Sequence, residues 1–110
     1  MSANVREIQA SDYEREVTGA AGPVVVDFFS TECPPCEALA PKYEAVADQF
    51  AGRVTFLKIF RQGNRELASR LGVSGSPTLV FFKNGQEQNQ RLTGEIKRSE
   101  IKAAVEALLG

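Results

Sequence analysis

The chain has 110 residues, about the length of one small domain with a single core. Apolar residues make up 43% of it and charged residues 25%, a globular balance that argues against disorder. A net charge of −1 gives no basic surface for nucleic acid or an anionic membrane, and the longest apolar stretch, 23–29, is too short to cross a bilayer. We therefore expect one domain over residues 1–110, placed in the cytoplasm because the N-terminus lacks the apolar core of an export signal.

The N-terminal part of the chain predicts two strands separated by a short helix. Residues 4–9 favour a short strand. Ser11 and Glu14 have the spacing of a capping box, which predicts a helix that starts there and runs to about Thr18. Residues 24–29 are mostly β-branched and aromatic and are apolar on both faces, as in a central strand covered from two sides.

A long helix is expected next, because Pro34 and Pro35 suit the first turn of a helix, where the backbone N–H groups have no intrahelical partner. Apolar residues follow at helical spacing, namely Leu39, Tyr43, Val46, Ala47 and Phe50. Pro41 lies inside this helix and should kink it, since proline removes one backbone donor and crowds the preceding turn.

The rest of the chain alternates strands and helices. Strands are predicted over 53–59, 77–82 and 88–92, and helices over 65–71 and 98–109. Gly72 is well placed to end the first of these helices in a left-handed conformation. Asn84-Gly85 is a strong two-residue hairpin signal, so the last two strands should be antiparallel. This order of elements implies a mixed sheet sandwiched by helices, with parallel strands first and a hairpin last.

The reactive side chains are few. The chain has no histidine, which excludes histidine-based acid–base catalysis, a Ser-His-Asp triad and a Cys-His pair. It has two cysteines, Cys33 and Cys36, where a closed zinc site needs four ligands, so no metal is expected. The glycines do not form a phosphate-binding loop. Two closely spaced thiols remain as the reactive chemistry.

The motif Cys33-Pro34-Pro35-Cys36 has a structural, a metal-binding and a redox interpretation. A structural disulfide here would close a loop of only two intervening residues, and so short a loop constrains the unfolded chain least. For a metal site, two cysteines supply only half of the four ligands. The position of Cys33 in the chain favours the redox interpretation. Cys33 follows a buried strand and begins a helix, where free backbone donors and the helix dipole favour a thiolate.

Three segments of the sequence together resemble the thioredoxin family. They are Val-Val-Asp-Phe-Phe over 25–29, the Cys-x-x-Cys segment ending in Ala-Leu-Ala-Pro over 33–41, and Gly-Ser-Pro-Thr-Leu-Val-Phe-Phe-Lys-Asn-Gly over 75–85. The resemblance covers nearly the whole chain. It implies an α/β fold, a three-layer α/β/α sandwich with a central mixed five-stranded sheet and four helices. It also implies a monomeric dithiol–disulfide oxidoreductase that binds no cofactor and passes electrons from a flavin-containing thioredoxin reductase to disulfide-containing substrate proteins.

The resemblance also assigns the site. It implies that Cys33 is the nucleophile and Cys36 the resolving thiol, paired as a Cys33–Cys36 disulfide when oxidised, with Asp27 as a buried carboxylate and Lys58 as its neighbour. The residues that it places along the substrate groove are Glu32, Pro34, Pro35, Ser76, Pro77, Thr93 and Gly94. Ser76–Pro77 is expected to be a cis peptide bond facing Cys33, although base rates alone favour a trans proline that opens an edge strand. The cis form leaves the Ser76 backbone free to pair with an extended substrate.

In the implied cycle, Cys36 must lose a proton before it attacks Cys33. Because the chain has no histidine, Asp27 is the expected proton acceptor. The alternative is that Asp27 is a strand residue facing solvent, but its apolar neighbours in the sequence argue for burial.

The chain departs from the family pattern around the motif. Glu32 and Pro34 stand where the family usually has tryptophan and glycine, Phe29 replaces a further tryptophan, and Phe60 replaces an acidic residue. Glu32 is either a solvated loop residue or a charge that disfavours the Cys33 thiolate and selects partners with basic rims. Two other functions stay open at this point: a non-catalytic protein-binding module and a redox sensor whose disulfide switches binding.

Overall fold

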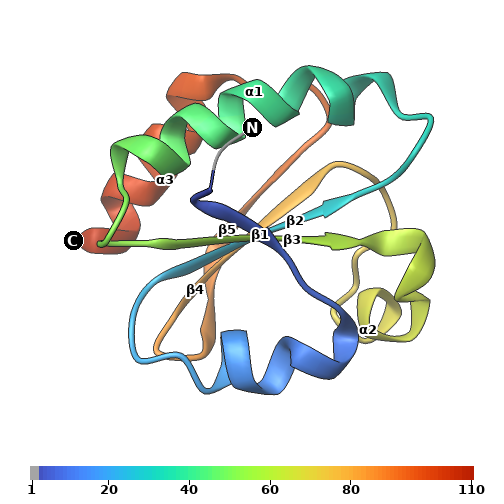
Figure 1. The fold of residues 1–110 in the computed structure, drawn as a ribbon, viewed down its shortest axis with the longest axis horizontal. Coiled ribbons are helices and arrows are strands. Elements are labelled where there is room, and N and C mark those ends of the chain that lie inside the picture. Colours follow the sequence, from blue (N-terminus) through green and yellow to red (C-terminus); the bar gives the residue numbers. More distant parts are fainter. Residues whose placement is uncertain (1–2) are drawn as a thin grey trace.

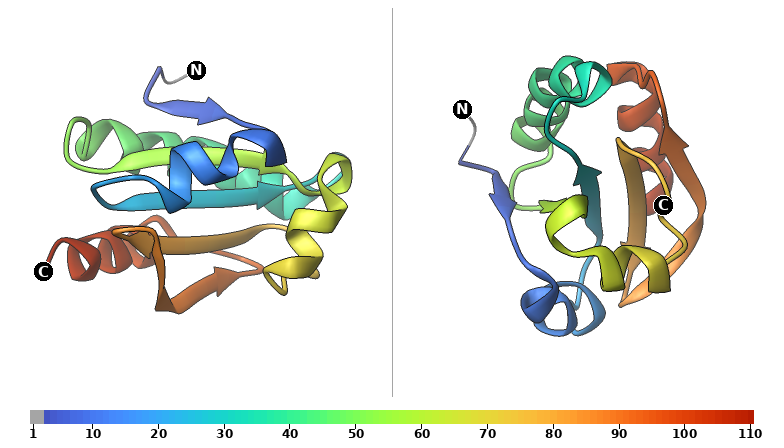
Figure 2. Two further views of the ribbon diagram at one scale, coloured as in Figure 1. Left: turned by 90° about the horizontal axis from the view of Figure 1, so that it is seen from below. Right: turned by 90° about the vertical axis from the view of Figure 1, so that its right-hand side faces the viewer.

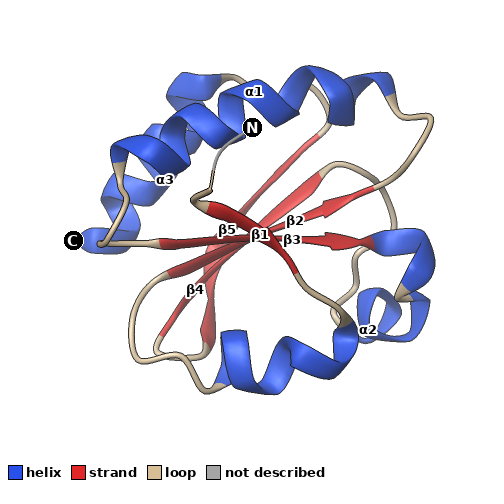
Figure 3. Cartoon of the chain, viewed as in Figure 1, coloured by secondary structure: helices blue, strands red, loops and turns tan. Residues whose placement is uncertain are grey.

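The computed structural model describes residues 3–110, so the first two residues of the predicted 1–110 domain lie outside the described range. It shows a mixed five-stranded sheet between two layers of helices (Figures 1 and 3). The elements in chain order are β1 (Val5–Glu7), η1 (Ala10–Asp12), η2 (Glu14–Thr18), β2 (Val24–Phe29), α1 (Pro34–Gln49), β3 (Thr55–Phe60), η3 (Arg61–Gly63), α2 (Arg65–Arg70), β4 (Thr78–Lys83), β5 (Gln86–Thr93) and α3 (Arg98–Leu109).

The strand order in the sheet is β1-β3-β2-β4-β5. β1 and β2 both run parallel to β3, whereas β4 is antiparallel to β2 and to β5. The predicted parallel half and terminal hairpin are therefore confirmed. The hairpin turn has the geometry that its sequence favours, with φ of 53° at Asn84 and 77° at Gly85.

Helices cover both faces of the sheet, as the edge-on views show (Figure 2). α1 and α3 lie on one face, and η1, η2 and α2 lie on the other. Alternate residues of each strand contribute to one of two apolar cores, so that Val25 and Phe56 pack under α1 while Val26 and Leu57 pack under the opposite layer. This alternation places the side chains of Asp27 and Lys58 on the α1 face.

The helix boundaries agree with the predictions except at the first helix. The expected capping box of Ser11 and Glu14 is wrong, because the helical segment begins at Ala10 and its N-cap lies two residues before Ser11. Gln9 is the residue that caps it, and its backbone N–H donates to Asp12 Oδ2 at 3.0 Å. The segment is a turn of 3₁₀ helix followed by a turn of π-helix over Glu14–Thr18. The long helix runs from Pro34 without interruption through Pro41, and within residues 3–110 no helix has the length and apolarity to span a bilayer.

Candidate active site

The two cysteines lie at the first turn of α1. Cys33 is the N-cap residue, with extended backbone, and the two prolines occupy the first helical positions, where a missing N–H costs nothing. Cys33 and Cys36 form a disulfide with a Cα–Cα distance of 5.2 Å. The Cys36 backbone N–H points at Cys33 Sγ, 3.3 Å away. After reduction, this donor and the positive end of the α1 dipole both favour a thiolate at Cys33.

The cysteines differ in accessibility. Cys33 is partly exposed, whereas Cys36 is 7% exposed and packs toward the sheet. The helical spacing therefore produces the expected asymmetry, with one sulfur at the surface and the other one turn deeper.

The predicted cis peptide bond is present at Ser76–Pro77. The loop that carries it meets the start of α1, and the carbonyl oxygen of Ser76 lies 3.7 Å from Cys33 Sγ. Ser76 thus places a backbone polar group directly beside the accessible sulfur.

Asp27 and Lys58 are neighbours, as predicted, because they are register partners in the parallel pair β2–β3. Asp27 is 5% exposed, and its Oδ1 atom accepts no hydrogen bond from the described residues. Burial raises the pKa of the Asp27 carboxyl to about 7, and the positive charge of Lys58 partly opposes this effect. Asp27, Lys58 and Cys36 line one small, partly open cavity of about 170 Å³, so the acidic residue and the buried cysteine border the same space.

Tyr43 supports this arrangement from α1. Its phenol O–H lies 2.7 Å from the carbonyl oxygen of Leu57 and 3.1 Å from that of Val25, which belong to the two strands that carry Lys58 and Asp27. Burial, and secondarily the charge of Asp27, raises the pKa of the Tyr43 phenol. Tyr43 therefore stays a neutral donor that ties the helix to the backbone beside the carboxyl.

Glu32 lies in the loop before Cys33 and is exposed. Its φ of 51° is in the left-handed region, which is uncommon for a residue with a side chain. The preceding residue, Thr31, faces Gln62 across the loop, with its N and Oγ1 atoms each 3.4 Å from the Gln62 side-chain oxygen. The loop that presents Glu32 is thus in contact with the segment that follows β3.

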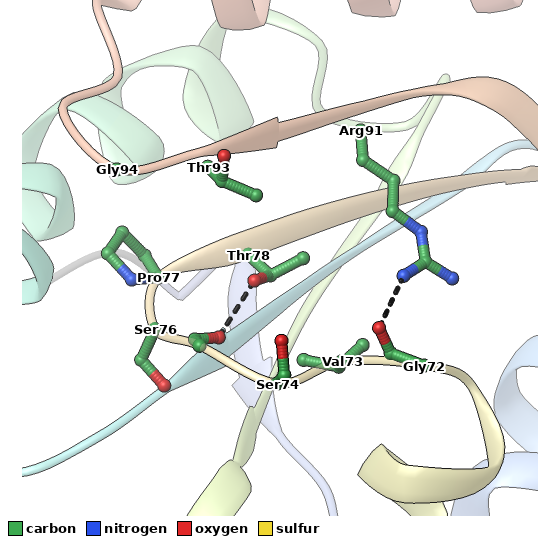
Figure 4. Close-up of a pocket in the computed structure, with 10 residues that line it drawn as sticks. Gly72, Val73, Ser74, Ser76, Pro77, Thr78, Arg91, Thr93 and Gly94 are labelled. Carbon is green, nitrogen blue, oxygen red and sulfur yellow. Dashed lines mark hydrogen bonds between the residues drawn. The ribbon is translucent and has the colours of Figure 1, made fainter.

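The remaining predicted groove residues divide between two hollows. Ser76, Pro77, Thr93 and Gly94 line a cavity of about 310 Å³ between the cis-proline loop and β5 (Figure 4). Pro34 and Pro35 line a second cavity, of about 320 Å³, together with Ile96. The other predicted site residues therefore line three cavities rather than one, and Cys33 and Glu32 lie in the loop and helix start beside them.

One part of the site was not predicted. Ser76 Oγ is 2.6 Å from Ser30 Oγ and accepts a hydrogen bond of 2.7 Å from Arg61 Nε. Arg61 is the first residue of η3, directly after β3, and no local sequence pattern marks it, because its contact depends on how η3 meets the loops of Ser30 and Ser76. The acidic and thiol side chains of residues 3–110 include no group of three or more placed to hold a metal ion.

Comparison with known proteins gives a consistent result over nearly the full length. The family model described as Thioredoxin matches residues 4–107. A thioredoxin of Peptoclostridium acidaminophilum is 36% identical over 110 residues, 100% of both chains, and a thioredoxin of Pseudomonas aeruginosa is 31% identical over 107 residues, 97% of this chain and 98% of the relative. The solved structure of the Malassezia sympodialis thioredoxin Mala s 13 matches with a TM-score of 0.84 at 33% identity, covering 96% of this chain and 91% of that one.

Proposed function

The chain belongs to the thioredoxin family and is a thiol–disulfide oxidoreductase that reduces protein disulfides and carries electrons, and from this premise we propose the role of each site residue. The observation that carries the proposal is the asymmetry of the dithiol: Cys33 is accessible at the N-terminus of α1, and Cys36 is buried in a cavity with Asp27.

In the first step, the Cys33 thiolate attacks one sulfur of the substrate disulfide. The substrate S–S bond breaks, a mixed disulfide forms, and the released substrate thiolate takes a proton from solvent. The Cys36 N–H and the α1 dipole stabilise the attacking thiolate. The Ser76 carbonyl beside Cys33 supports pairing with an extended substrate segment, which places the scissile disulfide over Cys33 Sγ.

In the second step, Cys36 attacks Cys33 Sγ. Asp27 accepts the Cys36 proton, since its carboxyl faces the same cavity and a pKa of about 7 makes it both a competent base and a competent acid near neutral pH. The new Cys33–Cys36 bond forms, the mixed disulfide breaks, and the second substrate sulfur leaves as a thiolate that takes a proton from solvent. Lys58 has a positioning and electrostatic role, because its charge favours the ionised form of Asp27.

The cycle closes when two electrons and two protons reduce the Cys33–Cys36 disulfide again. We propose that a flavin-containing thioredoxin reductase donates these electrons. We propose the reducing cytoplasm as the compartment, since this protein can reduce further substrates only where its disulfide is continuously reduced again. No bound cofactor is required, because the sulfurs carry the electrons. A monomer of one domain over residues 1–110 is proposed because helices cover both faces of the sheet.

Glu32 and the groove residues set the choice of partner in this proposal. Pro34 and Pro35 line the groove on one side of Cys33, and Ser76, Pro77, Thr93 and Gly94 line it on the other. The exposed Glu32 carboxylate adds a negative charge where the family usually presents an aromatic ring, which favours partners with basic groups facing this loop.

Alkylation of the reduced protein tests these roles. With limiting reagent, Cys33 should be labelled first, because it is the exposed thiol and the one with dipole support. Mass spectrometry of the singly labelled protein identifies the site. Equal labelling of both cysteines, or preferential labelling of Cys36, would contradict the proposed order of attack.

A further inference from the structure

A second hollow adjoins the substrate groove on the side of α2. This cavity of about 580 Å³, here called the Arg61 pocket, is lined by Arg61, Arg65, Ser69 and Ser74, together with uncharged neighbours. It shares the stretch 72–74 with the cavity that contains Ser76 and Pro77, so the two are continuous along one loop. None of its lining residues is acidic. The Arg61 pocket therefore extends from the cis-proline loop to two positively charged side chains, Arg61 and Arg65.

Arg61 is held in place rather than extended into solvent. It is partly buried, and its Nε atom donates to Ser76 Oγ at 2.7 Å. Ser76 Oγ is in turn 2.6 Å from Ser30 Oγ, which fixes the position of the hydroxyl. Because only Nε is used in this contact, the two terminal nitrogens of the guanidinium remain for a further acceptor, and a planar fork of this kind matches a carboxylate.

The arginines near the groove differ in how far they are already paired. Arg91, which lies on β5, makes an ion pair with Glu87 and donates to the carbonyl oxygen of Leu71. It also donates to the carbonyl oxygen of Gly72 (Figure 4). Arg61 and Arg65 take part in none of the ion pairs among residues 3–110. Arg65 makes one contact, from its Nε to the Gln62 carbonyl oxygen at 3.3 Å. Of the three arginines that line this cavity and the one beside it, the two without an ion pair therefore both lie in the Arg61 pocket.

We infer that the Arg61 pocket is a carboxylate subsite of the substrate groove, and that the preferred substrates are protein segments with an acidic residue close to the attacked cysteine. The inference rests on the proposed function. Ser76 contacts both the Arg61 pocket and the reactive sulfur: its Oγ is 2.7 Å from Arg61 Nε, and its carbonyl oxygen is 3.7 Å from Cys33 Sγ. An extended segment advances about 3.3 Å per residue, so the acidic side chain lies within about three positions of the cysteine.

Glu32 adds a negative charge next to the same groove. Its loop touches η3, the segment that begins with Arg61, through Thr31 and Gln62. Glu32 repels an acidic side chain close to its loop, and Arg61 attracts one into the Arg61 pocket. The two charges therefore favour a bound segment whose carboxylate lies in the pocket and away from the Glu32 loop.

The test uses three short peptides that differ at one position near a single cysteine, which carries glutamate, glutamine or lysine, with the cysteine activated as its 2-pyridyl disulfide. Attack by Cys33 on the peptide sulfur releases neutral 2-thiopyridone, which is followed by absorbance, and Cys36 then frees the peptide thiol. The wild-type protein should react with the glutamate peptide about five to ten times faster than with the glutamine peptide, and slowest with the lysine peptide. The preference should decrease as salt is added.

Arg61→Gln should reduce the ratio of the glutamate-peptide rate to the glutamine-peptide rate to less than about twofold, whatever change in the glutamine-peptide rate follows from losing the bond to Ser76. Arg98→Gln, which removes an exposed arginine at the start of α3, is the matched control and should keep the full preference. Glu32→Gln should accelerate the reaction with the glutamate peptide more than the reaction with the glutamine peptide, and so should increase the preference.

Equal rates with the glutamate and glutamine peptides in the wild type would overturn the carboxylate subsite and leave the proposed function intact. A preference that survives in Arg61→Gln would overturn the assignment to Arg61. No reaction with any of the three peptides would instead contradict the proposed function. Oxidised glutathione is an additional probe: if it reacts faster than the glutamate peptide, and Arg61→Gln abolishes that advantage, the assignment to a protein segment is wrong.

Discussion

Replacing Asp27 by alanine should stabilise the protein and slow its reaction. Since one pKa unit corresponds to about 1.4 kcal/mol, a carboxyl whose pKa rises from 3.8 to about 7 on folding costs the folded state about 4 kcal/mol at pH 7 and above. Below pH 3.8 the carboxyl is protonated in both states and the cost is absent. Between these values the unfolded chain releases the proton and the folded protein keeps it, so stability falls as pH rises.

Asp27→Ala removes this cost together with a few buried atoms. We expect a net gain in the free energy of unfolding of about 2–3 kcal/mol at pH 8, since the lost packing offsets part of the electrostatic gain. At pH 4 the gain should disappear. Disulfide reduction should become slower, because Cys36 then has no internal proton acceptor.

Urea unfolding of the oxidised protein at several pH values between 4 and 8 measures the effect. The chain has no tryptophan, so circular dichroism is the suitable signal. Glu106→Ala, which removes an exposed carboxylate on α3, is the control and should leave the pH dependence of stability as in wild type. If Asp27→Ala has wild-type stability at pH 8 and wild-type activity, the carboxyl is neither destabilising nor a base, and the reasoning fails.

Three further substitutions test other parts of the account. Glu32→Trp should change the turnover of a small disulfide by less than about tenfold but improve coupling to a conventional thioredoxin reductase more strongly, and an equal change in both assays would assign Glu32 to the chemistry. Tyr43→Phe should lower the free energy of unfolding by about 1–2 kcal/mol, since it removes a donor to two backbone carbonyls; urea unfolding without a loss would refute that role. Gly85→Ala should cost about 1–3 kcal/mol, because the residue has a φ of 77° and an added Cβ would overlap the Thr18 carbonyl oxygen, and an unchanged melting temperature would contradict this.

The sequence predicted those parts of the fold whose signals are local. The two prolines after Cys33 and the helical spacing that follows them indicated α1, and Asn84-Gly85 indicated the hairpin with the observed backbone conformation. The first helix shows the limit of such signals. The sequence indicated Ser11 as the cap, but the structure uses Gln9 with Asp12, and glutamine is not among the residues preferred at an N-cap.

The candidate site was predictable where its residues belong to a motif or follow from strand alternation. The burial of Asp27 and the proximity of Lys58 are of this kind, since the register of a parallel pair brings the two residues side by side. The bond from Arg61 to Ser76 was not predictable. The two residues are far apart in sequence, and their contact depends on a cis peptide bond and on the conformation of the loop after β3.

The equilibrium between the Cys33–Cys36 pair and glutathione redox buffers tests the central claim most directly. Thiolate stabilisation makes a dithiol more oxidising, and here one backbone N–H faces Cys33 Sγ while the neighbouring Glu32 carboxylate opposes a negative charge. We therefore expect a strongly reducing potential, near the value of about −270 mV that is typical of thioredoxin. A potential of about −180 mV or higher would mark the pair as an oxidant or isomerase and would contradict the account of this protein as a protein-disulfide reductase.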